Sequence, residues 1–339
     1  MKAVARGWQT AGPAGCGGFF FLVERSLPVV TQRILDPQQI QARDPSAIPR
    51  IRLPERAAHF STRAARLRRL ADHNPIGGYV RLMAVLVDAQ QQALEHFSAT
   101  PPSREAIASA QHHSMPILPA LSGERDPQWR TLLYRLADRV EAAGAVTPAL
   151  AKVLDALRAM DAAQLDAQAD AILAQRYTEI APATAPFIVA ALQVVWTDLA
   201  SRIDVQDVPY VDAPGVCPVC GSPPVASIVR VGGAYQGYRY TQCALCGTEA
   251  HVVRVKCTNC DSTKGIAYQG IDGGNAALKA ESCDECHTYR KIGYQEKDLD
   301  FEPLADDLAS LTLDLLMSDA GYRRASPNPL LWPEVPGDQ

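Results

Sequence analysis

Eight of the nine cysteines stand in four C-x-x-C pairs, which all lie between Cys217 and Cys286 of the 339-residue chain. A C-x-x-C turn points two thiolates at one ion, and two such turns complete a tetrahedral four-sulfur site. The candidate ligands are Cys217, Cys220, Cys243 and Cys246, followed by Cys257, Cys260, Cys283 and Cys286. This pattern predicts metal binding rather than a redox dithiol or unpaired thiols.

The cysteine pattern is an internal duplication, which indicates how the ligands pair. The spacing C-x2-C-x22-C-x2-C occurs twice, so that every cysteine of the first unit has a counterpart at the same place in the second. We therefore expect two separate sites, one within 217–246 and one within 257–286. Four thiolates accept zinc, which would be structural, or iron, which would form a rubredoxin-type centre. The cysteine spacing does not distinguish zinc from iron.

The second site contains a C-x-x-C-H sequence, Cys283 to His287, which also spells the c-type haem attachment motif. We reject haem because both cysteines are needed to close the second four-cysteine site. His287 is then expected to be an exposed residue that follows the turn.

No catalytic motif accompanies these sites. The chain lacks a nucleophile elbow, a phosphate loop, an H-E-x-x-H sequence and a dinucleotide fingerprint. A site closed by four cysteines leaves no coordination position for a substrate, which disfavours metal-assisted hydrolysis. The sequence predicts no enzyme active site.

The charge balance argues against nucleic acid as a partner. The whole chain has a formal charge of −4, and residues 217–297 hold nine basic and seven acidic side chains. Each site of four thiolates and a divalent ion adds negative charge, so this segment ends net negative and does not suit a phosphate backbone.

Composition predicts an ordinary globular protein with no membrane insertion. Hydrophobic residues make up 47% and charged residues 21% of the chain. No apolar run approaches the roughly 18 residues that span a membrane, because Gln193 and Asp198 interrupt the best candidate at 187–200. No export signal is recognisable at the start, so we expect a cytoplasmic protein.

The elements around the cysteines predict an α+β fold with a helical N-terminal domain and two tandem rubredoxin-like or zinc-ribbon modules. Residues 1–29 are expected to be disordered or a mis-assigned extension, with translation starting at Val30. Residues 30–208 form the helical domain, 209–298 the metal modules, and 299–339 a C-terminal helix and an extended tail. Helices are expected from about Pro54 to Asp72, over 79–97, after Asp126, after the caps Thr147 and Asp161, and from Thr184 through Leu199. Strands are expected at 225–231, 238–242, 252–255 and 265–269, and the last helix at 304–320, ended by Gly321.

The segment from Arg50 to Asp72 is rich in arginine, with seven arginines against two acidic residues. The ordinary interpretation is a solvated helix face. The functional interpretation is a docking surface for an acidic partner.

Several motifs resemble the formate dehydrogenase accessory protein FdhE family, over nearly the whole chain from Thr31 onward. They are I-P-R-I-R-L-P from Ile48, N-P-I-G-G-Y from Asn74, A-P-F-I from Ala185, C-P-V-C-G-S from Cys217, T-E-A-H-V-V-R-V-K-C-T-N-C from Thr248, K-A-E-S-C-D-E-C-H-T-Y from Lys279, Y-Q-E-K-D from Tyr294 and D-D-L-A-S-L from Asp306. Two departures are visible: Ala250 replaces the usual aromatic residue, and His287 replaces a usual small one. Neither is a ligand.

The resemblance implies a cytoplasmic accessory factor that is required for active respiratory formate dehydrogenase and acts on its molybdenum-containing catalytic subunit before export. It implies iron in rubredoxin-like sites with the eight cysteines as ligands, so iron is favoured and zinc is possible. We therefore expect a non-enzymatic maturation factor that binds the catalytic subunit and could self-associate. The alternatives are a zinc-ribbon nucleic-acid-binding protein and a rubredoxin-type electron carrier.

Overall fold

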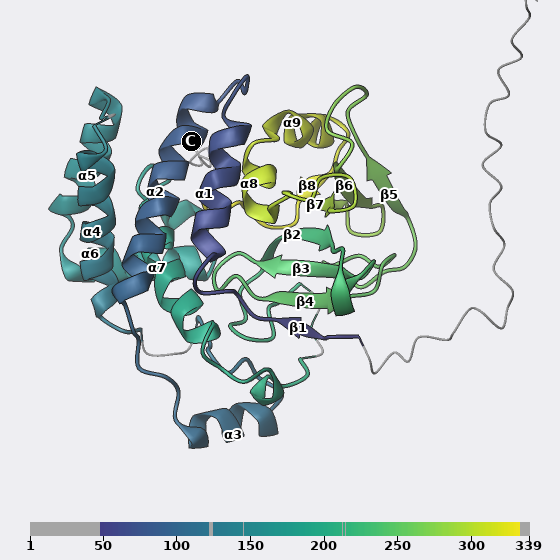
Figure 1. The fold of residues 1–339 in the computed structure, drawn as a ribbon, viewed down its shortest axis with the longest axis horizontal. Helices are drawn as coiled ribbons and strands as arrows, with labels where there is room; N and C mark the ends of the chain where they lie inside the picture. Colours follow the sequence, from purple (N-terminus) through teal and green to yellow (C-terminus); the bar gives the residue numbers. More distant parts are fainter. Residues whose placement is uncertain (1–47, 122–124, 145, 212, 214, 333–339) are drawn as a thin grey trace, which may run out of the picture. The chain divides into compact units, whose positions relative to one another are not determined.

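Helices dominate the described residues from 48 to 200, and strands dominate those that follow (Figure 1). The computed structural model describes residues 48–121, 125–144, 146–211, 213 and 215–332. The expected extension 1–29 lies outside these residues. All of the described residues belong to one unit, Pro45–Gln339.

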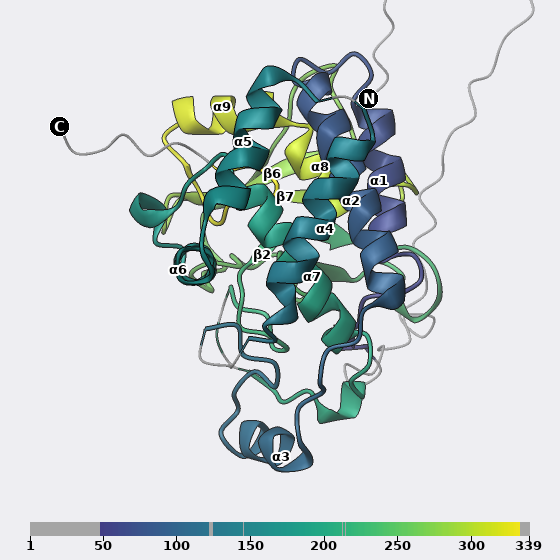
Figure 2. The ribbon, with the colours of Figure 1, turned by 90° about the vertical axis from the view of Figure 1, so that its left-hand side faces the viewer.

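Seven α-helices precede the metal-binding strands in the described part of the chain: α1 His59–Leu70, α2 Gly77–His96, α3 Arg104–His112, α4 Gln128–Ala142, α5 Pro148–Ala159, α6 Ala162–Leu173 and α7 Ala185–Ala200. The expected caps are present, since the side chains of Thr147 and Asp161 accept hydrogen bonds from the backbone of Leu150 and Gln164. Both views show α3 apart from the other helices (Figures 1 and 2).

Helix α7 is the centre of the helical part. All of its residues except Leu199 are buried, and α2, α4 and α6 pack on it (Figure 2). A helix that is buried on every side needs such a shell of neighbours. Among the described residues no helix is both long and apolar enough to cross a membrane.

The first helix begins later than the sequence predicts. The sequence places Pro54 in its first turn, but α1 starts at His59. The reason lies in the preceding residues, because β1 (Ile51–Arg52) pairs with a strand of the sheet and the chain needs a turn before it enters the helix.

One eight-stranded sheet contains both cysteine units. Its further strands are β2 Pro224–Val229, β3 Arg239–Cys243, β4 Glu249–Val252, β5 Ile266–Gln269, β6 Leu278–Cys283, β7 Thr288–Tyr294 and β8 Arg323–Arg324. The order is β1-β4-β3-β2-β7-β6-β5, with β8 on β7. Strands β5, β6 and β7 repeat β2, β3 and β4 in the second unit, as the cysteines do. The parallel pair of β2 and β7 joins the two units side by side.

The sequence misses four strands and misplaces one. It predicts no strand at β1, β6, β7 or β8, and it places a strand at 252–255 where the structure has β4, Glu249–Val252. The C-x-x-C turn sets this start, because the amide of Cys243 donates to the carbonyl of Thr248 and the strand begins at the next residue. Val253 and Val255 are exposed beyond it.

The expected C-terminal helix is two helices, α8 Pro303–Leu308 and α9 Leu311–Asp319. Lys291 of β7 donates its ammonium hydrogens to the carbonyls of Asp307 and Ser310, at 2.8 and 3.1 Å. These carbonyls lie at the break between the helices. Helix α8 packs against α1 and β2, which joins the end of the chain to its first helix and to the sheet.

The arginine-rich segment is solvated only in part: Arg50, Arg68 and Arg69 are exposed, whereas other arginines of the segment point into the protein. Its seven arginines all have partners within the chain: Arg50 with the carbonyl of Val208, Arg52 with Glu249, Arg56 with Asp198, Arg63 with Glu302, Arg66 with Asp298 and Asp306, Arg68 with Asp88, and Arg69 with Asp300. Arg63 and Arg66 are buried. Six of the seven arginines thus pair with acidic residues of the same chain.

Candidate metal centres

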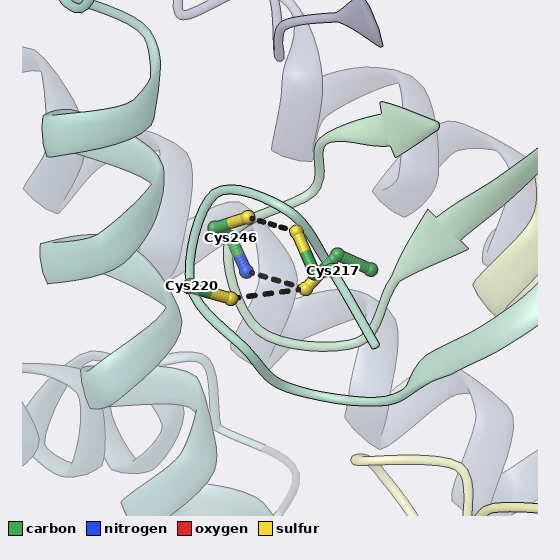
Figure 3. A group of neighbouring side chains, drawn as sticks. Cys217, Cys220 and Cys246 are labelled. Atoms are coloured by element: carbon green, nitrogen blue, oxygen red, sulfur yellow. Dashed lines mark hydrogen bonds between the residues drawn. The ribbon is translucent and has the colours of Figure 1, made fainter. Parts of the chain in front are cut away.

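The eight cysteines meet in the two groups of four that their spacing predicts. Site A consists of Cys217, Cys220, Cys243 and Cys246, and site B of Cys257, Cys260, Cys283 and Cys286; within each group the four sulfurs lie within 4.8 Å of one another. Figure 3 shows the sulfurs of Cys217, Cys220 and Cys246 turned toward one another from two loops.

The sulfur separations fit a tetrahedral metal ion. In site A the closest pairs are 3.6 Å (Cys217 to Cys246) and 3.4 Å (Cys220 to Cys243) apart. Both corresponding pairs in site B are 3.7 Å apart. A tetrahedron with metal–sulfur bonds of about 2.3 Å has sulfur–sulfur edges of about 3.8 Å. Each group could therefore hold one ion such as zinc or iron.

Each ligand loop is closed by its own backbone. In site A the amide of Cys217 donates to the carbonyl of Ser222 at 2.9 Å, and the amide of Gly221 donates to the carbonyl of Cys217 at 2.8 Å. The first loop of site B repeats both bonds through Ser262 and Asp261. Amides also face the sulfurs, as from Leu245 to Cys243 Sγ at 3.4 Å. The backbone hydrogen bonds alone therefore give the loops a shape that suits thiolate ligands.

The buried sulfurs of one group would need a bound cation in order to be ionised together. Burial raises the pKa of the Cys217 and Cys243 thiols well above the ordinary value, and it raises the pKa of Cys257 to about 12. Four thiolates in one buried group are not stable as free anions, so deprotonation and metal binding occur together. The chemistry of the donor set and its geometry both fit a metal ion with no open coordination position.

Site A lies where the helices meet the sheet. The amides of Leu118 and Ala120 donate to the carbonyls of Val219 and Cys220 in its first loop, at 2.8 and 3.0 Å. Gln193 of α7 donates to the carbonyl of Ala244 in its second loop at 2.7 Å. All four cysteines belong to the main hydrophobic core. An ion here would connect both loops to the interior of the helical part.

Site B lies away from the helical part, on the second unit of the sheet. Cys260 is exposed and Cys286 is half-buried. The guanidinium of buried Arg290 donates to the hydroxyl of Thr258 at 2.9 Å, which supports the first loop from behind. Cys283 and Cys286 both face this site and His287 is exposed, in agreement with the rejection of haem.

The sequence does not predict the side chains that hold the ligand loops. Gln193 and Arg290 reach these loops from elements far away in the chain, and neither forms part of a local pattern. One difference between the two sites is visible in the sequence. The residue that follows the second cysteine of a pair is Gly221 or Gly247 in site A, and Asp261 or His287 in site B.

Models of known protein families match both the helical part and the two cysteine units of the chain. Residues 48–212 match the family model "FdhE, N-terminal", residues 216–254 match "FdhE, central domain" and residues 255–331 match "FdhE, C-terminal domain".

Relatives match over most of their length. The Protein FdhE homolog of Cronobacter sakazakii is 41% identical over 307 residues, which cover 89% of this chain and 98% of the relative. Protein FdhE of Escherichia coli K12 is 41% identical over 296 residues, or 86% and 94% of the two chains. The crystal structure of the FdhE protein from Pseudomonas aeruginosa superposes with a TM-score of 0.73 at 36% identity, covering 85% of this chain and all of that one. With its two four-cysteine groups and its helical and sheet parts matched in turn, this chain belongs to the FdhE family.

Proposed function

We propose that this protein is an accessory factor required for active respiratory formate dehydrogenase. Membership of the FdhE family supports this role, because the match extends from residue 48 to 331 and includes both cysteine units. In this proposal the protein binds the catalytic subunit of the dehydrogenase in the cytoplasm and performs no catalysis itself.

The geometry of the sites supports a non-enzymatic role. Each metal would be surrounded by four cysteines, which leaves no position for a substrate or a reactive water. The chemistry that a bound ion would supply is cross-linking of loops and, for iron, a change of oxidation state. The chain's own residues position the loops through Leu118, Gln193 and Arg290.

Binding of the catalytic subunit is tested by co-purification. Metal-loaded full-length protein is mixed with a purified formate dehydrogenase catalytic subunit, and we expect a complex that survives size-exclusion chromatography. An unrelated molybdenum enzyme serves as the control partner. Failure of the folded, metal-loaded protein to bind the catalytic subunit would count against the proposal.

The ion in the sites is the second part of the proposal. Family resemblance favours iron, and four-thiolate sites also accept zinc. Metal analysis of protein purified without added metal, with a visible spectrum, distinguishes them, because iron gives thiolate charge-transfer bands and zinc gives none. Two ions per chain are expected in either case.

A second candidate function is that of a rubredoxin-type electron carrier. The exposure of Cys260 favours it, since an exposed ligand shortens the path for electron transfer to a partner. A reversible redox wave from the iron form would support this function. A zinc-only protein would exclude it.

A further inference from the structure

The two metal sites have the same ligands and the same spacing, but they differ in exposure. In site A all four cysteines are buried, with at most 4% of each residue exposed. In site B, Cys257 and Cys283 are buried, whereas Cys286 is half-buried and Cys260 is exposed. The duplication has therefore produced one enclosed site and one open site.

The residues inside the C-x-x-C turns explain the difference. The third residue of each turn is Val219 or Leu245 in site A, and both side chains are buried. The corresponding residues in site B are Asn259 and Glu285, and both are exposed. Apolar side chains at the tips of the turns favour a covering layer, whereas an amide and a carboxylate favour contact with water.

The residue that follows each turn shows the same distinction. Gly247 of site A has a φ of 74°, and a Cβ there would overlap the ring of His59, which packs against it from α1. The equivalent residue in site B is His287, with a φ of 51°, and it is exposed. Only glycine fits the left-handed backbone under so close a neighbour, so Gly247 is required by the contact with His59. In site B no such neighbour excludes a side chain at His287.

The cover of site A comes from three elements. The segment 116–120 bonds to its first loop, while Gln193 of α7 and His59 of α1 lie against its second loop. Because all four cysteines are buried under this cover, the cover must open locally before a reagent reaches a sulfur of site A. No equivalent opening is needed at Cys260, which is already exposed.

We propose that site B is an exchangeable metal site, open to competing thiol or chelating ligands, whereas site A is a closed site that retains its metal. In the exchange step a donor atom of the incoming ligand binds the metal while the bond between the metal and Cys260 Sγ breaks. The released thiolate takes up a proton from water, and the metal is neither oxidised nor reduced. This inference does not depend on the identity of any client protein.

The test measures zinc release from the full-length protein, loaded with zinc and carrying Cys16→Ser so that every thiol belongs to a site. A chromogenic chelator should remove one zinc per chain on the order of tenfold or more faster than the second, because local opening limits release from enclosed sites. Cys260→Ser should abolish the fast step and leave one slowly released zinc. Release of both ions at one rate, or loss of the slow step in Cys260→Ser, would overturn the proposal.

Two further measurements distinguish exposure from a general loss of stability. With iodoacetamide, peptide mass analysis of the zinc-loaded protein should find Cys260 and Cys286 alkylated before any cysteine of site A. His59→Ala should speed the slow step and leave the fast step unchanged, with exposed His112→Ala as the control that alters neither. Earlier alkylation of site A, or an unchanged slow step in folded His59→Ala, would contradict the assignment.

Discussion

The guanidinium of Arg66 in α1 binds both carboxylate oxygens of Asp306 in α8, at 2.8 and 2.6 Å, across 240 residues of sequence. The same guanidinium reaches Asp298 at 2.6 Å, and Arg63, one turn earlier, binds Glu302 at 3.0 Å. Burial raises the pKa of Asp306, and the hydrogen bonds and charge of Arg66 oppose that rise. These pairs attach the C-terminal helices to the first helix.

Arg66→Leu should therefore destabilise the protein by about 3–5 kcal/mol, because it leaves the buried charge of Asp306 without a partner. Arg69→Leu is the matched control, since the pair of Arg69 and Asp300 is more than half exposed on both sides. Its loss should change the free energy of unfolding by no more than about 1 kcal/mol. Urea denaturation of the metal-loaded proteins measures the free energy of unfolding of both variants. Equal losses of stability would contradict the inference that the buried pair contributes more than the exposed one.

The two metal sites should contribute unequally to stability. Cys217→Ser removes a ligand of site A inside the main core, and it should lower the Tm by on the order of 10 °C or more, because a structural site supplies folding free energy. Cys260→Ser removes an exposed ligand at the surface and should lower the Tm by a few degrees at most. Calorimetry of the zinc-loaded proteins gives the comparison. A larger effect from Cys260→Ser would show that site A is not the structural site.

The contact between Gly247 and His59 can be tested by adding one methyl group. Gly247→Ala places a Cβ in the left-handed region and into the imidazole ring, and should cost about 2–4 kcal/mol from backbone strain and overpacking together. Gly237→Ala controls for the backbone alone, because φ is 76° there and nothing lies within 4 Å of the added atom. Its cost should stay near 1–2 kcal/mol, roughly the strain itself. Similar losses in the two variants would remove the argument for a close contact.

His59 should make stability depend on pH. Burial, followed by the nearby charges of Arg63 and Arg52, lowers the pKa of His59 well below its ordinary value of about 6.5. A depressed pKa in the folded state contributes stability that is present above pH 6.5 and is lost as the pH falls below it. Wild type should thus lose up to about 1.4 kcal/mol per pH unit more than His59→Gln between pH 6.5 and 5. Thiolate protonation affects both proteins, so the difference between them isolates the histidine; parallel curves would refute this prediction.

The sequence predicts the cysteine groups because a turn with two thiolates is a local feature that repeats. The helix caps Thr147 and Asp161 and the apolar helix α7 are predictable for the same reason. Each depends on residues within one or two turns of one another, so a short window of sequence contains the physical cause.

Strands β6 and β7 escape prediction because their charged residues look like surface loop. Glu281 is buried through its pair with Arg239 at 2.7 Å, and Lys291 is buried through Asp314 at 2.6 Å. The partners lie 42 and 23 residues away. A window of sequence shows the charge but not the partner that permits its burial, so no alternation of apolar and polar residues is visible.

The arginine-rich segment misleads for a related reason. Its excess of positive charge is visible in the sequence, and so are the compensating carboxylates of Asp298, Glu302 and Asp306. The two sets are far apart in the chain, since Glu302 lies 239 residues from its partner Arg63. Without the fold, nothing joins the two segments.

The long reach of these pairs has a consequence for synthesis of the chain. A ribosome that adds about 5–20 residues per second makes Arg63 and Arg66 roughly 10–50 s before Glu302 and Asp306. Strand β2 is likewise synthesised before β7, its parallel neighbour in the sheet. Until Glu302 and Asp306 are made, Arg63 and Arg66, which are buried in the folded protein, have no counter-ions. A chain that terminates soon after the last cysteine would contain every metal ligand and still be unable to bury its first helix.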